Sequence, residues 1–448
     1  MNRFFVSSAA LAALLATALP AHAELDVINL KKTIETSLAS DYPKLDALYK
    51  ELHAHPELAF QEVKTAARLA AEMRALGFEV TENVGKTGLV AIYKNGDGPT
   101  IMVRTELDGL PMEEKTGLDY ASRDKTTWNG REVFVAHSCG HDIHMASWVG
   151  TAKTLIGLKD KWHGTLMFIA QPAEEIVAGA RAMLSAGLFT RFGTPDVALA
   201  LHDGPAPHGM VFYRTGVGSS AADGLEITFH GRGGHGSAPH TTVDPIGIAA
   251  RFIVDVQSVI SREKDPSEFG VVSIGSIRGG TAANIIPDSV QLSGTIRSYK
   301  PEVRAKLHAG IERTAKAAAA MSDAPTPDIQ ILEGTKPIIN DPEVVAAVAD
   351  VLKVALGDNF RTSPPVTASE DFSAFAAAGV PSMMFNIGVY DPERFVAARN
   401  GGPPIPSNHS PQFAPVPKPT IETGVTAMTL AVLGAFDQKT KRMKETGR

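Results

Sequence analysis

Residues 41–201 alternate predicted helices with short segments that are apolar along their whole length, and this pattern constrains the fold of the 448-residue chain more than any other feature. A strand that is apolar throughout is buried on both faces, as in an α/β sheet covered by helices on both sides. The predicted strands are 89–93, 100–104, 165–170 and 197–201, and the predicted helices are 44–53, 63–76, 144–156 and 178–186. We therefore predict an α/β fold for this part of the chain.

Polar residues follow the ends of these predicted strands. Glu106 and Asp108 come after one strand, Glu174 and Glu175 after the next, and His202 after the last. Open α/β sheets bind ligands beyond the carboxyl ends of their strands. The sequence therefore predicts a functional site at that edge of the sheet.

The pattern changes near residue 218. The next predicted elements are strand 225–230, a helix from Pro245 to about Arg262 with Asp244 as its N-cap, strands 271–277 and 289–297, helix 303–321 and strand 328–332. This βαββαβ order predicts a compact α+β domain inserted at 218–333. Helix and strand alternation then resumes with 342–356, 382–387 and 420–436. We expect the segments 24–217 and 334–448 to form one domain around the insertion.

The first 23 residues have the pattern of a secretory signal peptide. A basic residue, Arg3, precedes an apolar stretch, and the small-x-small sequence at 21–23 predicts cleavage near Ala23. The alternative is a membrane anchor, but polar residues interrupt the stretch and it is short for a bilayer span. We predict an exported protein, either periplasmic or secreted.

The composition excludes several partners. The chain has 43 basic and 49 acidic residues, which argues against nucleic acid or an anionic membrane surface as a partner. No apolar run after the N-terminal segment is expected to span a bilayer. The single cysteine has no intramolecular disulfide partner, so we expect the stability to come from hydrophobic cores.

The single cysteine lies in the sequence Ser-Cys-Gly-His-Asp-Ile-His at 138–144. Cys-x-His alone is a weak signal, but mixed thiolate and imidazole ligands favour zinc-like ions. We predict that two metal ions share Cys139 as a bridge, and the predicted terminal ligands are His141, Glu175, His202 and His409. The alternative is that Cys139 is a small core residue and that the histidines are ordinary polar or capping residues.

Glu174 and Glu175 are adjacent, which limits how they share a site. Neighbouring side chains of a strand face opposite ways, so both can reach one site only from a loop. One carboxylate would then bind metal, and the other would take a proton from a metal-activated water and pass it to the leaving amine. The alternative is an acidic first helical turn that the helix dipole favours.

Seven motifs, taken together and in this order, resemble the M20 metallopeptidase family. They are His-Ser-Cys-Gly-His-Asp-Ile-His at 137–144, Gln-Pro-Ala-Glu-Glu at 171–175, Gly-Arg-Gly-Gly-His-Gly-Ser-Ala-Pro-His at 231–240, Asn-Ile-Ile-Pro-Asp at 284–288, Gly-Thr-Ile-Arg at 294–297, Ser-Glu-Asp-Phe-Ser at 369–373 and Asn-His-Ser-Pro at 408–411. More closely, they resemble its amidohydrolase branch of hippurate hydrolases, N-acyl-amino-acid deacylases and auxin-conjugate hydrolases. The resemblance implies a metallo-aminopeptidase-like catalytic domain with a mixed sheet, and an inserted α+β domain that acts as a lid or dimerisation domain.

The resemblance also implies roles for individual residues. It implies that the five ligands bind two divalent ions (Zn, Mn, Ni or Co) and that Glu174 is the general base. His235 matches a lid-domain histidine that reaches the partner's site in dimeric relatives and stabilises the oxyanion. Asn284 and Arg297 match positions that hold the substrate's free carboxylate. Asp108 matches a residue that orients a ligand imidazole.

One motif departs from the branch, which commonly has Asp-x-Asp-Ala-Leu-Pro. This chain has Glu-Leu-Asp-Gly-Leu-Pro at 106–111, so the first acid is one methylene longer. We expect Glu106 to alter metal affinity or pocket shape, and its role stays open.

The resulting functional prediction is metal-dependent hydrolysis of the amide in an N-acyl amino acid, such as a hippurate-like conjugate, with Glu174 as general base. The resemblance implies a homodimer formed through the inserted domain. A dipeptidase or carboxypeptidase would use the same chemistry, and the sequence does not fix the acyl group. A third alternative is an exported metal- or amino-acid-binding protein, against which Glu174 argues because mere binding needs no base.

Overall fold

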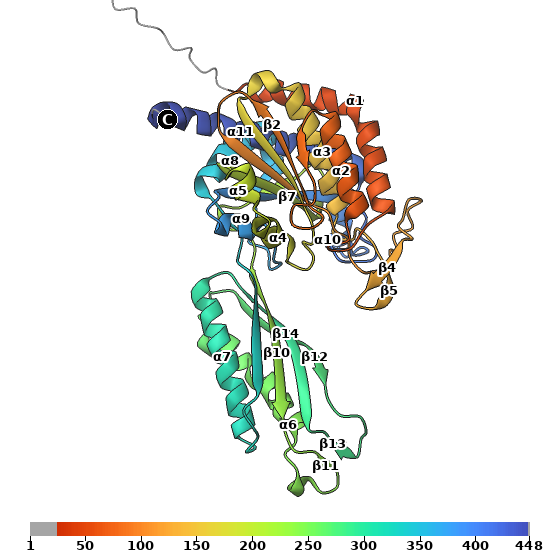
Figure 1. Cartoon of the computed structure of the whole chain (residues 1–448), viewed down its shortest axis with the longest axis vertical. Coiled ribbons are helices and arrows are strands. Elements are labelled where there is room, and N and C mark those ends of the chain that lie inside the picture. The colour runs from red at the N-terminus through yellow and green to blue at the C-terminus, as the bar shows by residue number, and fades with distance from the viewer. Residues whose placement is uncertain (1–24, 447–448) are drawn as a thin grey trace, which may run out of the picture.

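The computed structural model describes residues 25–446 as two regions, an α/β region and a smaller α+β region that projects from it (Figure 1). The predicted signal peptide at 1–23 lies outside the described residues. The smaller region is inserted in the chain between two halves of the larger one.

An eight-stranded mixed sheet forms the centre of the α/β region. Its strand order is β1 (Glu79–Thr81), β2 (Leu89–Asn95), β6 (Gly164–Gln171), β3 (Thr100–Glu106), β7 (Val197–Pro207), β18 (Ser382–Tyr390), β8 (Val211–Tyr213) and β17 (Phe360–Thr362). The central pairs β6·β3, β3·β7 and β7·β18 are parallel, whereas β1·β2, β2·β6 and β18·β8 are antiparallel. The mixed sheet confirms the predicted fold class, and each predicted strand of this region lies inside an observed strand.

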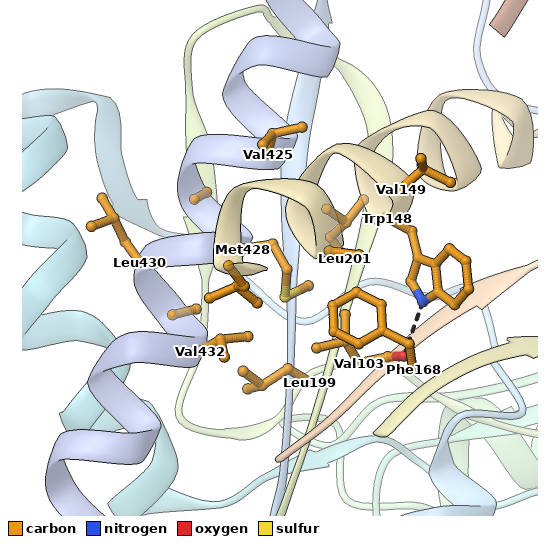
Figure 2. Packing of buried hydrophobic residues seen from close by; sticks show 14 of the residues in the cluster. Val103, Trp148, Val149, Phe168, Leu199, Leu201, Val425, Met428, Leu430 and Val432 are labelled. Carbon is orange, nitrogen blue, oxygen red and sulfur yellow. Dashed lines mark hydrogen bonds between the residues drawn. The ribbon is translucent and has the colours of Figure 1, made fainter. Parts of the chain in front are cut away.

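Long helices cover one face of this sheet. They are α1 (Val27–Ala54), α2 (Val63–Ala75), α3 (His141–Gly157), α8 (Pro342–Leu356) and α11 (Pro417–Thr446). Figure 2 shows how α11 packs with α3 over the strands, and Trp148 of α3 donates a hydrogen bond to the Val103 carbonyl of β3 at 3.1 Å. The helix predicted at 44–53 is the last part of α1, which continues through Pro43.

Shorter helices cover the opposite face, and small elements complete the region. The helices are α4 (Gly179–Ser185), α5 (Leu188–Phe192) and α9 (Ser373–Ala377). The hairpin β4 (Lys125–Trp128) with β5 (Arg131–Phe134) and helix α10 (Pro392–Arg399) lie outside this packing.

Helix α11 corrects one expectation from the sequence. Its segment 417–443 is long and apolar enough to cross a membrane by length and composition, with a mean hydropathy of 1.2 in its most apolar window, whereas no such run was expected. In the structure 83% of the segment's most apolar window is buried inside the protein. The helix is apolar on nearly all sides because α1, α3, α8 and the sheet surround it.

The inserted region has its own sheet and core. Antiparallel strands in the order β12 (Gly270–Arg278), β14 (Ser289–Ser298), β10 (Ala221–His230) and β15 (Asp328–Thr335) form the sheet, and α6 (Pro245–Asp255) and α7 (Pro301–Ala320) cover one face. The chain order matches the predicted βαββαβ pattern. The helix predicted to reach about Arg262 ends as an α-helix at Asp255, and a π-helical turn follows at Val259–Glu263.

Two short strand pairs mark the ends of this inserted region. At its base, β9 (Gly216–Val217) pairs with β16 (Ile339–Asn340), which joins the segments that enter and leave the insertion. At its far tip, β11 (Gly234–His235) pairs with β13 (Ile285–Ile286). Figure 1 shows this tip at the end of the molecule opposite the eight-stranded sheet.

Candidate metal centre

The structure brings the five predicted metal ligands together, although they come from four separate segments. Cys139 and His141 lie at the start of α3, Glu175 in the loop after β6, His202 on β7 and His409 in the loop before α11. The Cys139 sulfur lies 3.6 Å from His202 Nε2 and 3.3 Å from His409 Nε2. Glu175 closes the cluster, 3.3 Å from His409 Nε2 and 3.9 Å from His141 Nε2.

The donor atoms divide into two groups that share the sulfur. One group is Cys139, His141 and His202, and the other is Cys139, Glu175 and His409; within each, the donor atoms lie within 4.8 Å of one another. A thiolate can bind two cations at once, whereas each imidazole here offers one nitrogen. This geometry suits a pair of cations with Cys139 between them.

The protonation chemistry of the cluster also fits a pair of divalent cations. Among the described residues, His141 Nε2 and Glu175 Oε1 are buried and have no hydrogen-bond partner. Burial lowers the pKa of His141 and so keeps its imidazole neutral, as a metal ligand must be. Burial raises the pKa of Glu175 to about 7, and burial together with the neighbouring Glu175, Glu174 and Asp203 carboxylates raises the pKa of Cys139 well above its usual range.

Hydrogen bonds to neighbouring backbone carbonyl groups orient two of the ligand imidazoles. His141 Nδ1 lies 2.8 Å from the Asp108 carbonyl oxygen, and His202 Nδ1 lies 2.7 Å from the Asp203 carbonyl oxygen. Each Nδ1–H donates to its carbonyl, which leaves Nε2 facing the cluster with a free lone pair.

Asp108 acts in a way that the sequence did not predict. Its carbonyl, rather than its carboxylate, orients His141, because Oδ1 is 3.7 Å from the ring nitrogen. The carboxylate instead accepts the backbone N–H groups of Glu174 and Glu175, both at 3.0 Å. Asp108 therefore connects the α3 ligand with the loop that carries both glutamates.

This glutamate-bearing loop has an unusual backbone. Ala173 adopts a positive φ of 51°, and its N–H donates to Glu62 Oε1 at 2.8 Å. Val177, on the other side of the pair, has a φ of 57°. Strained backbone of this kind persists where the surroundings hold it, and here it directs both adjacent glutamates to one site. Glu174 and Glu175 therefore lie in a loop, which is the placement that two adjacent residues need to reach one site.

Glu174 lies beside the predicted ligands and is only 7% exposed. Its Oε2 lies 3.9 Å from His141 Nε2. Burial raises the pKa of Glu174 well above its usual range, and the nearby Glu370 and Glu175 carboxylates add to this shift. A carboxyl group with a raised pKa at the edge of a cavity has the properties of a general base and acid.

A buried ionic network behind the site was not predicted from the sequence. Arg104 of β3 is 2% exposed, and its Nη2 bonds to Glu370 at 2.7 Å and Asp371 at 3.1 Å. It also bonds to Glu106. The signal was present, since an arginine within a buried apolar strand requires acidic partners. The acidic partners Glu370 and Asp371 lie in the Ser-Glu-Asp-Phe-Ser motif, for which the sequence predicted no role.

The network gives Glu106 defined contacts. Its Oε2 lies 3.0 Å from His144 Nδ1, and His144 Nε2 accepts the backbone N–H of Asp203 at 2.9 Å. Both His144 nitrogens are thereby used in hydrogen bonds, so His144 supports the ligand strand β7 and is not available as a ligand itself. Glu106 thus links Arg104 to the segment that carries His202.

The His409 loop is fixed by its own contacts with the ligand segments. His409 has a positive φ of 66°, and its N–H donates to the Ser138 carbonyl at 2.7 Å. Asn408 donates both to the Cys139 carbonyl and to Asp203 Oδ1, each at 3.0 Å. These contacts hold the loop against the start of α3, although it is about 270 residues away in sequence.

The three predicted residues of the inserted region occupy two different places. Arg297 lines the same cavity of about 610 Å³ as Cys139 and Glu174, and its Nη1 donates to Ser369 Oγ at 3.3 Å. His235 and Asn284 are instead exposed at the far tip, where Gly236 N–H donates to the Asn284 carbonyl. Within one chain, the structure does not bring His235 or Asn284 to the metal cluster (Figure 1).

Comparison with known proteins identifies the class to which this fold and site belong. Residues 102–404 match the model of peptidase family M20/M25/M40, and the chain belongs to this family. It is therefore an enzyme that hydrolyses amide bonds.

Individual relatives share most of the chain. A hippurate hydrolase of Campylobacter jejuni is 36% identical over 341 residues, covering 74% of this chain and 85% of the relative. Thermostable carboxypeptidase 2 of Saccharolobus solfataricus is 34% identical over 390 residues, covering 86% and 93%. The crystal structure of a dinuclear metal binding M20 peptidase from Bacillus subtilis has a TM-score of 0.71 at 26% identity, covering 91% and 99%.

Proposed function

We propose that this protein hydrolyses the amide bond of N-acyl amino acids, with two divalent metal ions held by Cys139 as the bridge and by His141, Glu175, His202 and His409. The observation that carries the proposal is the convergence of these donors, in two groups that share one sulfur, beside Glu174 and a substrate-sized cavity. A binding protein would have no use for a buried carboxyl group with a raised pKa at this position.

Glu174 is the proton carrier in this proposal. When bound, divalent cations polarise the scissile carbonyl and lower the pKa of water. Glu174 accepts the proton of the attacking water and then donates it to the departing amine nitrogen. Glu174 gains and then releases the proton, and burial together with the neighbouring Glu370 and Glu175 carboxylates raises its pKa, which favours the protonated form that the second step uses. Asp108 keeps Glu174 in place through the backbone N–H bond.

Arg297 is the proposed partner of the substrate's free carboxylate. It is partly buried in the cavity wall and forms no ion pair within residues 25–446. Its planar guanidinium can donate two parallel hydrogen bonds to a carboxylate.

We propose that His235 and Asn284 act in the metal centre of a second copy of the chain. Both are exposed at the tip of the inserted region, which lies away from the α/β region that carries this chain's own metal cluster. We therefore propose a homodimer formed through the inserted region, in which each subunit's His235 stabilises the oxyanion in the other subunit's site.

The acyl group and the amino acid are the finer part of the proposal. The cavity of about 610 Å³ is large enough for an aromatic acyl group joined to an amino acid, as in hippurate. A carboxypeptidase acting on dipeptides is the second candidate, supported by the similarity to the carboxypeptidase named above.

Zinc, manganese, nickel and cobalt all suit the donor set. The sequence at 1–23 supports export as a further proposal, which the N-terminal sequence of the mature protein would test.

The test is a hydrolysis screen of metal-reconstituted protein and its Glu174→Gln variant. The substrates are N-acetyl, N-benzoyl and indoleacetyl amino acids together with dipeptides. We expect turnover of acyl amino acids and a loss of at least 100-fold in kcat in the variant, with unchanged metal content. Wild-type turnover of dipeptides alone would favour the carboxypeptidase alternative. Full activity in the Glu174→Gln variant would remove Glu174 from the mechanism.

A further inference from the structure

The cavity beside the metal cluster is lined by charged groups of both signs. Carboxylates of Glu174, Glu175 and Glu370 line it near the predicted ligands. Two guanidinium groups, those of Arg297 and Arg214, line the same cavity elsewhere. In the part of the chain that the structure describes, neither arginine forms an ion pair: Arg297 donates to Ser369 Oγ and Arg214 to the Ser363 carbonyl.

Strand register places Arg214 on the wall that carries the metal ligand His202. His202 of β7 pairs with Asn386 of β18, and Asn386 pairs with Phe212 of β8. Paired residues of neighbouring strands project to the same face of a sheet, and all three line the cavity. Arg214 directly follows the last residue of β8, two positions beyond Phe212, and it lines the same cavity.

The register also gives the separation between the two groups. Two strand spacings of about 4.8 Å and one two-residue step of about 6.8 Å place the Cα atoms of His202 and Arg214 roughly 12 Å apart. A substrate extending from the metal cluster along this wall therefore reaches the guanidinium. The wall between them carries the polar Asn386 together with the apolar Phe212 and Met384.

The Arg214 side chain is held but retains donors for a ligand. Nη1 donates to the Ser363 carbonyl at 3.3 Å, the one side-chain hydrogen bond of Arg214 within the described residues. Its other N–H groups have no protein acceptor. Arg214 is exposed and lines the cavity, and a guanidinium with free donors there is suited to a carboxylate, which accepts two parallel hydrogen bonds.

We propose that Arg214 binds a second carboxylate of the substrate, in addition to the free carboxylate that Arg297 holds. This inference rests on the proposed function, because it treats the cavity as the site of an acyl amino acid. The second carboxylate belongs either to the amino-acid side chain or to the acyl group, and the chemistry at Arg214 is the same for both.

The test compares two pairs of substrates that differ in one charge. N-acetylglutamate against N-acetylglutamine tests the side chain, and N-succinylmethionine against N-succinamoylmethionine tests the acyl group. The enzymes are the wild type, Arg214→Gln and the matched control Arg361→Gln. Arg361, on the adjacent strand β17, is exposed, bonds to the Asp358 carbonyl and does not line the cavity.

We expect the wild type to prefer the charged member of one pair in kcat/KM. Arg214→Gln should lower kcat/KM for that compound about 10- to 100-fold and for its neutral partner less than threefold, and Arg361→Gln should change neither. Equal losses for both members of each pair, or a wild type without preference in either pair, would overturn the proposal.

Binding measurements separate this inference from the proposed function. Calorimetry of the same four compounds with the Glu174→Gln protein needs no turnover. A tenfold weaker affinity for the charged compound after adding Arg214→Gln supports the carboxylate site even if no substrate is hydrolysed, in which case the proposed function alone fails. An affinity independent of Arg214 would overturn the inference even if neutral acyl amino acids are hydrolysed.

Discussion

Replacing Gly140 with alanine tests whether the backbone between Cys139 and His141 is fixed by its contact with Asp203. Gly140 has a φ of +85°, and a Cβ built there lies closer than 3.0 Å to the Asp203 carboxylate, which no real Cβ contact tolerates. The left-handed backbone costs alanine about 1–2 kcal/mol. Displacing a buried side chain adds about 1–3 kcal/mol, so the variant should lose roughly 2–5 kcal/mol of unfolding free energy.

The chain offers a matched control for the backbone part of this cost. Gly117 has a similar φ of +80°, and a Cβ there meets nothing within 4 Å. Gly117→Ala should therefore lose only about 1–2 kcal/mol, and the difference between the variants measures the collision with Asp203. Urea unfolding of both proteins, prepared without metal, gives the two free energies.

The same collision should weaken metal binding. The Asp203 carboxylate accepts a hydrogen bond from the Asn408 side chain. Asn408 also donates to the Cys139 carbonyl, and it directly precedes the predicted ligand His409. Displacing a residue that supports ligands in this way lowers metal affinity about 10- to 100-fold. Chelator competition should therefore show weaker binding in Gly140→Ala and unchanged binding in Gly117→Ala. Equal unfolding free energies and equal metal affinities in the two variants would refute the reasoning.

Three further predictions follow from other contacts. Arg104→Met leaves Glu106, Glu370 and Asp371 buried without their cation, so urea unfolding should show a loss of about 3–5 kcal/mol, and wild-type stability would contradict this. Burial lowers the pKa of His53, but its hydrogen bonds to Asp142 and Glu114 outweigh burial and raise the pKa to about 10, so NMR of labelled histidine should find this imidazole protonated at pH 8. The stabilisation from this pKa difference is complete below pH 6.5 and decreases as pH rises through about 10, and titration near 6.5 would disprove it. Mixing inactive Glu174→Gln and His235→Ala chains should restore up to about a quarter of wild-type activity if His235 acts across a dimer, and no recovery in verified mixed dimers would count against that role.

Elements with local signals could be predicted from the sequence. Helix α8 has its predicted bounds of 342–356, because Asp341 accepts the N–H groups of Glu343 and Val344 and Gly357 ends the helix with a positive φ. The helix-covered α/β sheet followed from continuously apolar strands, whereas its mixed strand directions were implied by the family resemblance. The adjacency of Glu174 and Glu175 gave a loop as the condition for both to reach one site.

Contacts between distant segments could not be predicted in the same way. Arg104 and Glu370 are 266 residues apart, and no local pattern gives their pairing. The sequence also did not show that Asp108 divides its carbonyl and carboxylate between two partners, because both uses depend on how β3, α3 and the glutamate loop meet. The positions of His235 and Asn284 depend on the length and direction of the inserted sheet, which set the tip far from the cluster.

An anomalous-difference map from crystals loaded with one divalent metal tests the central claim most directly. We predict two peaks per chain, both about 2.3 Å from the Cys139 sulfur, one beside His141 and His202 and the other beside Glu175 and His409. Peaks that leave the sulfur outside bonding distance, or that avoid these imidazoles, would contradict the account.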